Sequence, residues 1–330
     1  MNKKLKKLVS GTSVTLCALI AFSLPTQVFA QNLPINTEVK TQTPNEEQSS
    51  DGYKTGNILS EIKDERDEYS KQFRLDDGTT MAVSYQEPIH YKNAAGEWVD
   101  YDNSLKNETV NSASPDEVTE EYTNKKSDFK VNYSKKSKEN SMVKIKGDNQ
   151  KISWGYKDTN KVRSTIVNND EKLTGNDKFT TLKNLTSEIT YENIYDDVDV
   201  QYFTTTTGVK ENIILKNKNA RSDFYIQYKF NNLTAKSVDD KTVELLNSKG
   251  DAVYKIEAPF MYDNDGKTST DLTLSITEQK KNKLTLKVSA DKKFLSDCSY
   301  PVTIDPQFTT SQNWQKSQCT YVDSSKPTTC

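Results

Sequence analysis

The sequence contains a single histidine, His90, so any catalytic arrangement that needs an imidazole base would have to use it. A Ser/His/Asp or Cys/His nucleophile requires such a base within hydrogen-bond reach. His90 lies between Ile89 and Tyr91, in a stretch that alternates along a predicted strand. Because successive side chains of a strand point to opposite faces, the two apolar neighbours share one face and His90 takes the other. We therefore expect His90 to be exposed to solvent and not catalytic.

Two groups of aspartates could bind Ca²⁺, which prefers carboxylate and carbonyl oxygens. They are Asp196, Asp197 and Asp199 in the first group, and Asp263 and Asp265 in the second. Asp263–Gly266, read DNDG, is similar to part of an EF-hand loop, but Leu272 stands where that loop needs its Glu. Aspartate and asparagine also bond to their own backbone in turns. The turn interpretation is favoured, and calcium is the only cofactor for which the sequence leaves room.

The 47 acidic residues include no pair whose spacing marks it for glycoside hydrolysis. With no carboxylate pair and no histidine-based nucleophile, the residues predict no catalytic site, and the chain is interpreted as a non-enzymatic protein. A cell-wall hydrolase is the least favoured alternative.

Aromatic side chains could stack on sugar rings if they were exposed. The candidates are Trp98, Trp154 and Tyr91. Such residues more often form the core of a β-sandwich, which is the favoured interpretation. Trp98 and Tyr91 remain the candidate ligand-binding residues of a carbohydrate-binding or adhesive domain acting on wall polymers, the second functional hypothesis.

The first thirty residues are typical of a secretory signal peptide. Four lysines precede the apolar segment Val14–Leu24, which is too short to cross a bilayer. Val28–Ala30 offers small residues for signal peptidase, so cleavage is expected after Ala30. Secretion to the cell wall or the extracellular space follows, with no later membrane span.

Removal of residues 1–30 takes away four lysines and no acid, which lowers the formal net charge from -2 to -6. A protein without surplus positive charge is poorly suited to neutralising phosphates, so nucleic acid is not an expected partner. Three cysteines remain in the secreted chain: Cys298, Cys319 and Cys330. Their odd number leaves the disulfide pairing open.

The polar residues 31–57 are predicted to form a disordered linker, because they cannot bury enough apolar surface to fold. A short helix is expected over Ser60–Gln72. Phe73–Leu105 reads as short strands with tight turns, among them Asp77-Gly78. Asn107–Lys126 is polar and reads as a loop, so any division of the β-rich body 58–305 into two subdomains is expected near 107–127.

Alternating apolar residues recur along the rest of the chain, which predicts an all-β, antiparallel, sandwich-like body. Phe224–Phe230 is the cleanest run, with Phe224, Ile226, Tyr228 and Phe230 on one face. Leu272–Ile276 is expected to pair with Leu284–Val288 across a polar turn, and Tyr300–Pro306 reads as a strand between two prolines.

Four blocks resemble the N-terminal region of secreted, cell-wall-associated proteins of Gram-positive bacteria of the Rhs or YD-repeat kind. They are EIKDERDEYSKQFRLDDGTTMAVSYQEPIHYKNAAGEWVDYDNSL, ITYENIYDDVDVQYFTTTTGVKENIIL, IEAPFMYDNDGK and YPVTIDP. The residues after the last block resemble the opening of a DNRLRE domain, so 306–330 is expected to be an incomplete module of that kind. The resemblance implies a secreted structural or presentation module whose partners are cell-wall polymers or downstream domains of the same polypeptide.

Overall fold

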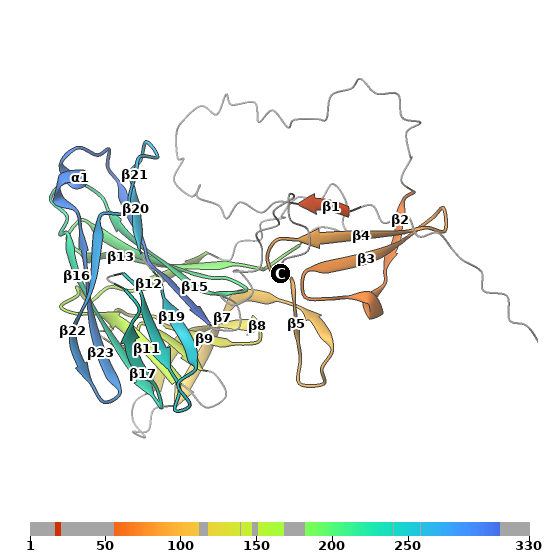
Figure 1. Cartoon of the computed structure of the whole chain (residues 1–330), viewed down its shortest axis with the longest axis horizontal. Coiled ribbons are helices and arrows are strands. Elements are labelled where there is room, and N and C mark those ends of the chain that lie inside the picture. Colours follow the sequence, from red (N-terminus) through yellow and green to blue (C-terminus); the bar gives the residue numbers. More distant parts are fainter. Residues whose placement is uncertain are drawn as a thin grey trace, which may run out of the picture. The chain divides into compact units, whose positions relative to one another are not determined.

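The computed structural model describes the backbone of β1 (Cys17–Ile20) and residues 56–111, 118–138, 140–146, 151–167, 182–239, 241–257 and 259–310. The chain divides into two compact units between His90 and Tyr91. Each unit is described by itself, and their elements are labelled in Figure 1. The predicted linker lies outside the described residues, apart from its last two positions.

The first unit is a four-stranded sheet with the strand order β1-β4-β3-β2. Its other strands are β2 (Ile58–Glu61), β3 (Ser70–Leu75) and β4 (Thr80–Tyr85). The predicted turn at Asp77-Gly78 joins β3 to β4, and Gly78 has a φ of 83°, which glycine reaches without steric cost. The helix expected over Ser60–Gln72 is wrong. That segment contains parts of β2 and β3 and only a single 3-10 turn, Lys63–Glu65, because its backbone bonds between strands, as the Ile62 N–H does to the Gln72 carbonyl at 2.7 Å.

Two short strands, β5 (His90–Lys92) and β6 (Trp98–Asp100), form a separate two-stranded sheet at the unit boundary. Between them Asn93 closes the turn, because its side-chain oxygen accepts the backbone N–H groups of Ala95 and Glu97. The predicted turn at this position is confirmed.

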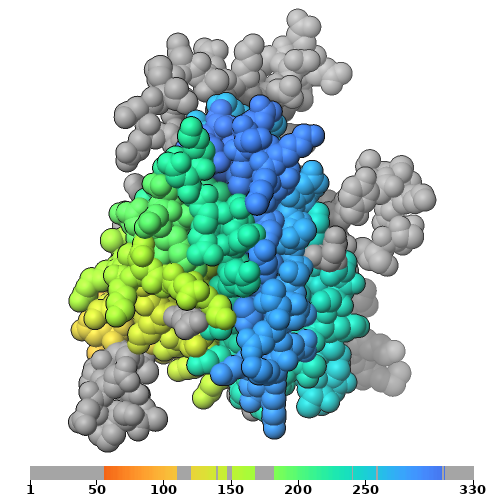
Figure 2. All heavy atoms as spheres, turned by 90° about the vertical axis from the view of Figure 1, so that its left-hand side faces the viewer, coloured from red at the N-terminus to blue at the C-terminus, as the bar shows by residue number. Residues whose placement is uncertain are grey.

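The second unit contains an eight-stranded antiparallel sheet. Its strands, in spatial order, are β22 (Leu272–Lys280), β23 (Lys283–Ala290), β16 (Asp223–Asn231), β11 (Lys151–Tyr156), β10 (Val143–Lys146), β9 (Lys130–Ser134), β8 (Val118–Lys126) and β7 (Asp102–Asn111). Figure 2 shows this progression as neighbouring bands that pass from yellow-green through green to blue. The expected pairing of Leu272–Ile276 with Leu284–Val288 is confirmed, since Leu274 lies opposite Val288.

Asn107–Lys126 is not a loop, because most of it belongs to the hairpin of β7 and β8. Asn107 lies opposite Tyr122 in this pairing, and Glu108 forms an ion pair with Lys130 of β9. The strand β7 is the edge of its sheet, where charged side chains protect against pairing with other chains. This polar composition hid the strand from sequence reasoning, and the unit boundary lies before this segment.

The opposing sheet of the second unit is built around β13, β14 and β15, and its main path has eight strands. They are β12 (Ser164–Val167), β13 (Ser187–Tyr195), β14 (Val198–Thr204), β15 (Gly208–Leu215), β25 (Gln307–Thr310), β19 (Ala252–Ile256), β18 (Val243–Leu246) and β17 (Thr234–Ser237). Three further strands branch from this path: β20 (Phe260–Tyr262), β21 (Thr268–Ser269) and β24 (Val302–Asp305).

The strand between two prolines is confirmed as β24, bracketed by Pro301 and Pro306. The chain then continues into β25, which pairs with both β15 and β19. Phe308 of β25 is buried in the core. The residues just after 306 therefore continue the same sheet, whereas 311–330 lie outside the described residues.

The two large sheets share one hydrophobic core, so the predicted all-β sandwich is confirmed. Trp154 of β11 stacks on Phe308 of β25 with ring centroids 4.8 Å apart and meets Tyr202 of β14 edge-on. The predicted inward face of β16 is fully buried, while Lys229 is exposed. Within the described part of the chain, no helix is long or apolar enough to span a membrane.

Candidate functional site

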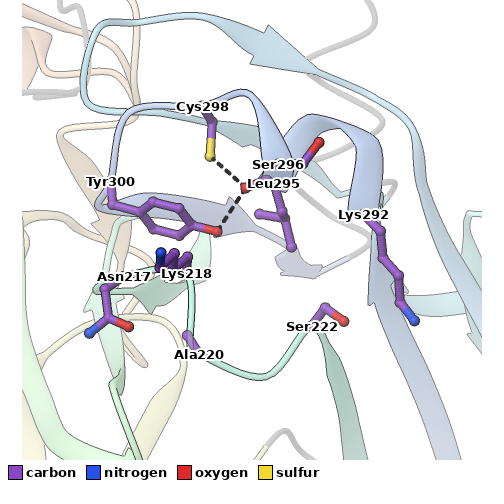
Figure 3. Close-up of a pocket in the computed structure, with 9 residues that line it drawn as sticks. All are labelled: Asn217, Lys218, Ala220, Ser222, Lys292, Leu295, Ser296, Cys298 and Tyr300. Carbon is purple, nitrogen blue, oxygen red and sulfur yellow. Dashed lines mark hydrogen bonds between the residues drawn. The ribbon is translucent and has the colours of Figure 1, made fainter.

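A hollow of about 800 Å³ opens on the second unit between two connecting segments (Figure 3). One wall is the 216–222 connection between β15 and β16. The other consists of the short helix α1 (Lys292–Ser296) and the residues that lead from it to β24. The lining residues are Asn217, Lys218, Ala220, Ser222, Lys292, Leu295, Ser296, Cys298 and Tyr300. Clefts of this size are typical of small-ligand sites.

The 216–222 wall is held by a local turn at Asn217. The backbone N–H of Ala220 donates to the Asn217 carbonyl at 3.1 Å, and the N–H of Asn219 donates to the Asn217 side chain at 2.8 Å. Asparagine is suited to such a turn because its side chain bonds to the backbone two residues on. At the start of the wall, Lys216 pairs with Asp199 at 2.7 Å. The backbone that presents Lys218 is therefore fixed at both ends.

The opposite wall begins at Asp291, which caps α1 by accepting the backbone N–H groups of Lys293 and Phe294 at 3.1 Å each. At its other end, the Leu295 carbonyl accepts the Tyr300 hydroxyl at 3.0 Å and the Cys298 thiol at 3.5 Å (Figure 3). These bonds close the chain back over the helix and place the Tyr300 ring in the lining.

Asp263 connects this wall to the turn after β20. Its carboxylate accepts the backbone N–H groups of Asp265, Lys267 and Ser299 at 2.9–3.0 Å. Desolvation opposes ionisation, yet the N–H groups of Ser299, Lys267 and Asp265 hold the pKa of Asp263 below its ordinary value. Asp263 therefore acts as an ionised structural acceptor that fixes the 297–300 segment.

The hollow carries positive charge, because Lys218 and Lys292 come from its two walls and none of the described lining residues is acidic. Nearby carboxylates are engaged by other lysines. Asp297 pairs with Lys267 at 3.0 Å, and Asp223 pairs with Lys287 at 3.3 Å. Among the described residues, neither lining lysine has a carboxylate within ion-pair distance.

Cys298 is a free cysteine, and it is partly buried. Burial raises the pKa of its thiol, which keeps the sulfur protonated at neutral pH. Protonated sulfur is a poor nucleophile, so the geometry assigns Cys298 a structural bond to Leu295 rather than chemistry. Cys319 and Cys330 lie outside the described residues, and the pairing of the three cysteines stays open.

His90 is fully buried, and the expectation of an exposed strand position is wrong. Its Nδ1 lies 2.6 Å from the Asp67 carbonyl oxygen, and because a carbonyl can only accept, Nδ1 is the donor. The backbone N–H groups of Ile89 and His90 both donate to the Glu68 carbonyl, at 2.8 and 3.2 Å. The segment thus folds back onto residues 67–68, and this long-range contact overrides the alternation.

The first group of calcium candidates is largely occupied by protein contacts. Asp199 accepts the backbone N–H of Asn193 at 2.6 Å and pairs with Lys216. Asp197 has a φ of 58° and its carbonyl accepts the N–H of Lys216, so it forms a turn. Asp196 lines a second, neighbouring hollow together with Asp158 and Asp223.

Nowhere in the described part of the chain do three or more His, Cys, Asp or Glu side chains form a group that could hold a metal ion. In the second candidate group, Asp265 accepts the hydroxyl of Ser299, and Asp263 is saturated by backbone donors. Calcium binding stays a prediction, and the described residues do not bring together a set of ligands for it.

The aromatic candidates divide into core and half-buried residues. Trp154 is 1% exposed and lies in the sandwich core, as the favoured interpretation predicted. Trp98 and Tyr91 are half-buried. Lys92 Nζ lies 4.9 Å from the centroid of the Trp98 ring, and the ring centroids of Tyr91 and Tyr101 are 5.0 Å apart. Their role in sugar binding stays a prediction.

Sequence reasoning missed a buried carboxyl group, Glu211 of β15. It is 4% exposed, lies opposite Tyr202 in the pairing of β14 with β15, and faces Trp154 and Tyr156 of the other sheet. Burial raises the pKa of Glu211 to about 7, while the Tyr202 and Tyr156 hydroxyls and the Trp154 indole act in the opposite direction. Within the described structure, Oε1 of Glu211 and both tyrosine hydroxyls have no well-formed hydrogen bond. The sequence did contain a sign of this burial, because Glu211 falls on the same strand face as the apolar residues Val209 and Ile213.

The chain is similar to known proteins whose names state an activity or a location. The chain is 28% identical over 283 residues to the tRNA nuclease WapA of Bacillus subtilis, covering 83% of this chain and 11% of that protein. It is 27% identical over 302 residues to the tRNA3(Ser)-specific nuclease WapA of Bacillus spizizenii, covering 87% and 12%. It is 25% identical over 255 residues to a protein of Geobacillus stearothermophilus, covering 75% of this chain and 92% of that one. That relative is named a wall-associated protein.

The chain therefore spans only 11–12% of the nucleases it matches. The interpretation of the chain as a non-enzymatic protein is contradicted, because three relatives are named tRNA nucleases, although the chain spans only a small part of each. No family model and no solved structure matches the chain. The DNRLRE module and the YD-repeat context stay predictions.

Proposed function

We propose that this chain is a region of a secreted, cell-wall-associated protein of the WapA kind, and that the β body supplies the wall association. The main support for this proposal is the difference in how much of each relative's length the chain spans. The chain spans 92% of a relative named for the wall alone, but about a tenth of relatives named for tRNA cleavage. Wall association is thus named for the relative whose length this chain spans almost fully, whereas tRNA cleavage is named for relatives of which it spans only a small part.

The whole protein, on this proposal, is a nuclease that acts on tRNA. The sequence predicted cell-wall polymers and downstream domains as partners and excluded nucleic acid, so tRNA as a substrate of the whole protein departs from that prediction. The two-sheet core supports a presenting role, because it gives a rigid body on which loops such as 216–222 and 292–300 are fixed in place.

Co-sedimentation with purified Gram-positive cell walls tests the proposal. The chain from Gln31 onward is expected to sediment with walls in a saturable manner and to stay in the supernatant without them. A matched secreted β-sandwich of unrelated sequence serves as the control. If the chain sediments no more than that control, wall association does not belong to this region.

A further inference from the structure

We propose that the hollow between 216–222 and α1 binds the phosphate groups of an anionic, polyhydroxylated polymer. This inference rests on the proposed wall association and names the chemistry of the wall component that the chain recognises.

The first argument is charge. Lys218 and Lys292 face the same hollow from two different segments, without an acidic residue among the described lining. Both are exposed, so their ammonium groups remain hydrated and available to a ligand. The positive charge is local, because the chain as a whole has a formal net charge of -2. A hollow of opposite sign to its surroundings selects an anion.

The nearby carboxylates Asp297 and Asp223 form their ion pairs with lysines that do not line the hollow. Asp297 is held by Lys267, and the pKa of Asp223 is lowered first by its bond with Ser289 and then by Lys287 and Lys292. Lys287 forms the ion pair with Asp223 at 3.3 Å. Lys292 acts on that carboxylate through its charge without forming an ion pair with it among the described residues, so its ammonium group keeps room for an anion in the hollow.

The second argument is the rest of the lining. Ser222 and the amide nitrogen of Asn217 offer hydrogen-bonding groups to ligand hydroxyls, whereas the Ser296 hydroxyl already donates to the Lys293 carbonyl at 2.8 Å. Leu295 and the Tyr300 ring offer an apolar surface to carbon-bound hydrogens (Figure 3). The phosphodiester of a polyol or sugar polymer combines these needs, since it alternates an anion with hydroxylated carbon. The volume of about 800 Å³ admits more than one repeating unit of that size.

Nucleic acid also alternates phosphate and sugar, but the observations favour a wall polymer. Nucleic-acid binding draws its affinity from many phosphate contacts, whereas this hollow offers two lysines. The described lining also offers a single aromatic ring, Tyr300, and that ring is tied by its hydroxyl to Leu295. Successive bases would need several free rings on which to stack.

Isothermal titration of the chain from Gln31 onward with soluble poly(glycerol phosphate) tests the inference, with single-stranded RNA of equal phosphate content as the second arm. The wild type is expected to bind the polymer more tightly than the RNA. Lys218→Ala with Lys292→Ala is expected to weaken binding at least about tenfold, since two charge-assisted contacts are lost. The control is Lys249→Ala with Lys281→Ala, which removes two exposed turn lysines elsewhere and is expected to bind like the wild type.

The inference is overturned if the Lys218/Lys292 variant binds the polymer as the wild type does, if RNA binds more tightly, or if the polymer does not bind. The lysines are exposed, so both variants should keep the wild-type melting temperature. The wall assay separates the two proposals. If the chain sediments with walls but does not bind the soluble polymer, the proposed wall association stands and the proposed site is refuted. A chain that binds the polymer but not walls has the site without the proposed function.

Discussion

Glu211 should make the second unit less stable as the pH rises from acid to neutral. The unfolded chain releases the Glu211 proton near pH 4.5, whereas burial keeps it bound in the folded protein until about pH 7. Between these two values the folded state holds a proton that the unfolded state has lost, so the free energy of unfolding falls as pH increases. Above pH 7 both states are ionised and the loss is complete.

The difference of about 2.5 pH units between these two pKa values corresponds to about 3 kcal/mol. Replacing Glu211 with glutamine keeps the shape of the side chain and removes its titration. We expect the Glu211→Gln variant to gain about 3 kcal/mol relative to the wild type between pH 4.5 and pH 7.5. Urea unfolding at several pH values measures this difference, provided that the m-values of the two proteins agree.

Other buried acids also titrate with raised pKa values, among them Glu188 and Asp305, both through desolvation first. Their contributions cancel because they are present in both proteins. Glu192→Gln provides the matched control, since this residue is exposed on β13. Parallel stability curves for the wild type and Glu211→Gln across the whole pH range would refute the assignment of a buried, titrating carboxyl group in the core.

Three further substitutions test other parts of the structure. Ile226→Ala should lower the free energy of unfolding by about 2–5 kcal/mol in denaturant melts, because Ile226 is buried in β16, and a loss below about 0.5 kcal/mol would place it at the surface. Gly78→Ala should lower the free energy of unfolding by about 1–2 kcal/mol, because Gly78 has a φ of 83°, and Gly78→Asn should lower it less, because Asn tolerates this region better. Equal melting temperatures of the two variants would contradict the turn. Asp263→Ala should cost about 2–3 kcal/mol through three lost N–H bonds, with amide exchange at Ser299 accelerated, and unchanged exchange would contradict the anchoring role.

The sandwich could be predicted because its central strands carry large apolar residues at alternate positions. Phe224–Phe230 is the clearest case, and the burial of its four alternating side chains follows the pattern. The edge strand β7 and its neighbour β8 carry no such signal. In β7 and β8 polar residues alternate with polar residues, so only the pairing of the two strands reveals them. The segment Ser60–Gln72 failed for a similar reason, because loosely spaced apolar residues fit a helix face as well as two short strands.

The candidate site could not be predicted from residue spacing. Lys218 and Lys292 are far apart in the chain, and they face one hollow only because β16 and β23 pair in the same sheet. His90 was predicted wrongly for a different reason. Its local pattern indicated exposure, but a contact with Asp67, distant in the sequence, accompanies its burial. Glu211 was visible as an acid in an apolar phase, but its significance depended on knowing that β15 lies at the centre of its sheet.

The position of β25 between β15 and β19 has a consequence for how the protein forms. Hydrogen-bonding partners such as Val209 and Phe308 come from distant parts of the chain, so the centre of one sheet stays open until the last described strand arrives. Folds that depend on such distant pairings form slowly, because the long intervening loop must close before the contact is gained. A chain that emerges from its N-terminus onward would therefore leave the first half of β15 and one edge of β19 unpaired until β25 is released, while the second half of β15 waits for β24. This order of events suits the secretion proposed for the protein, since it delays formation of the rigid sandwich until nearly all of the described chain has passed.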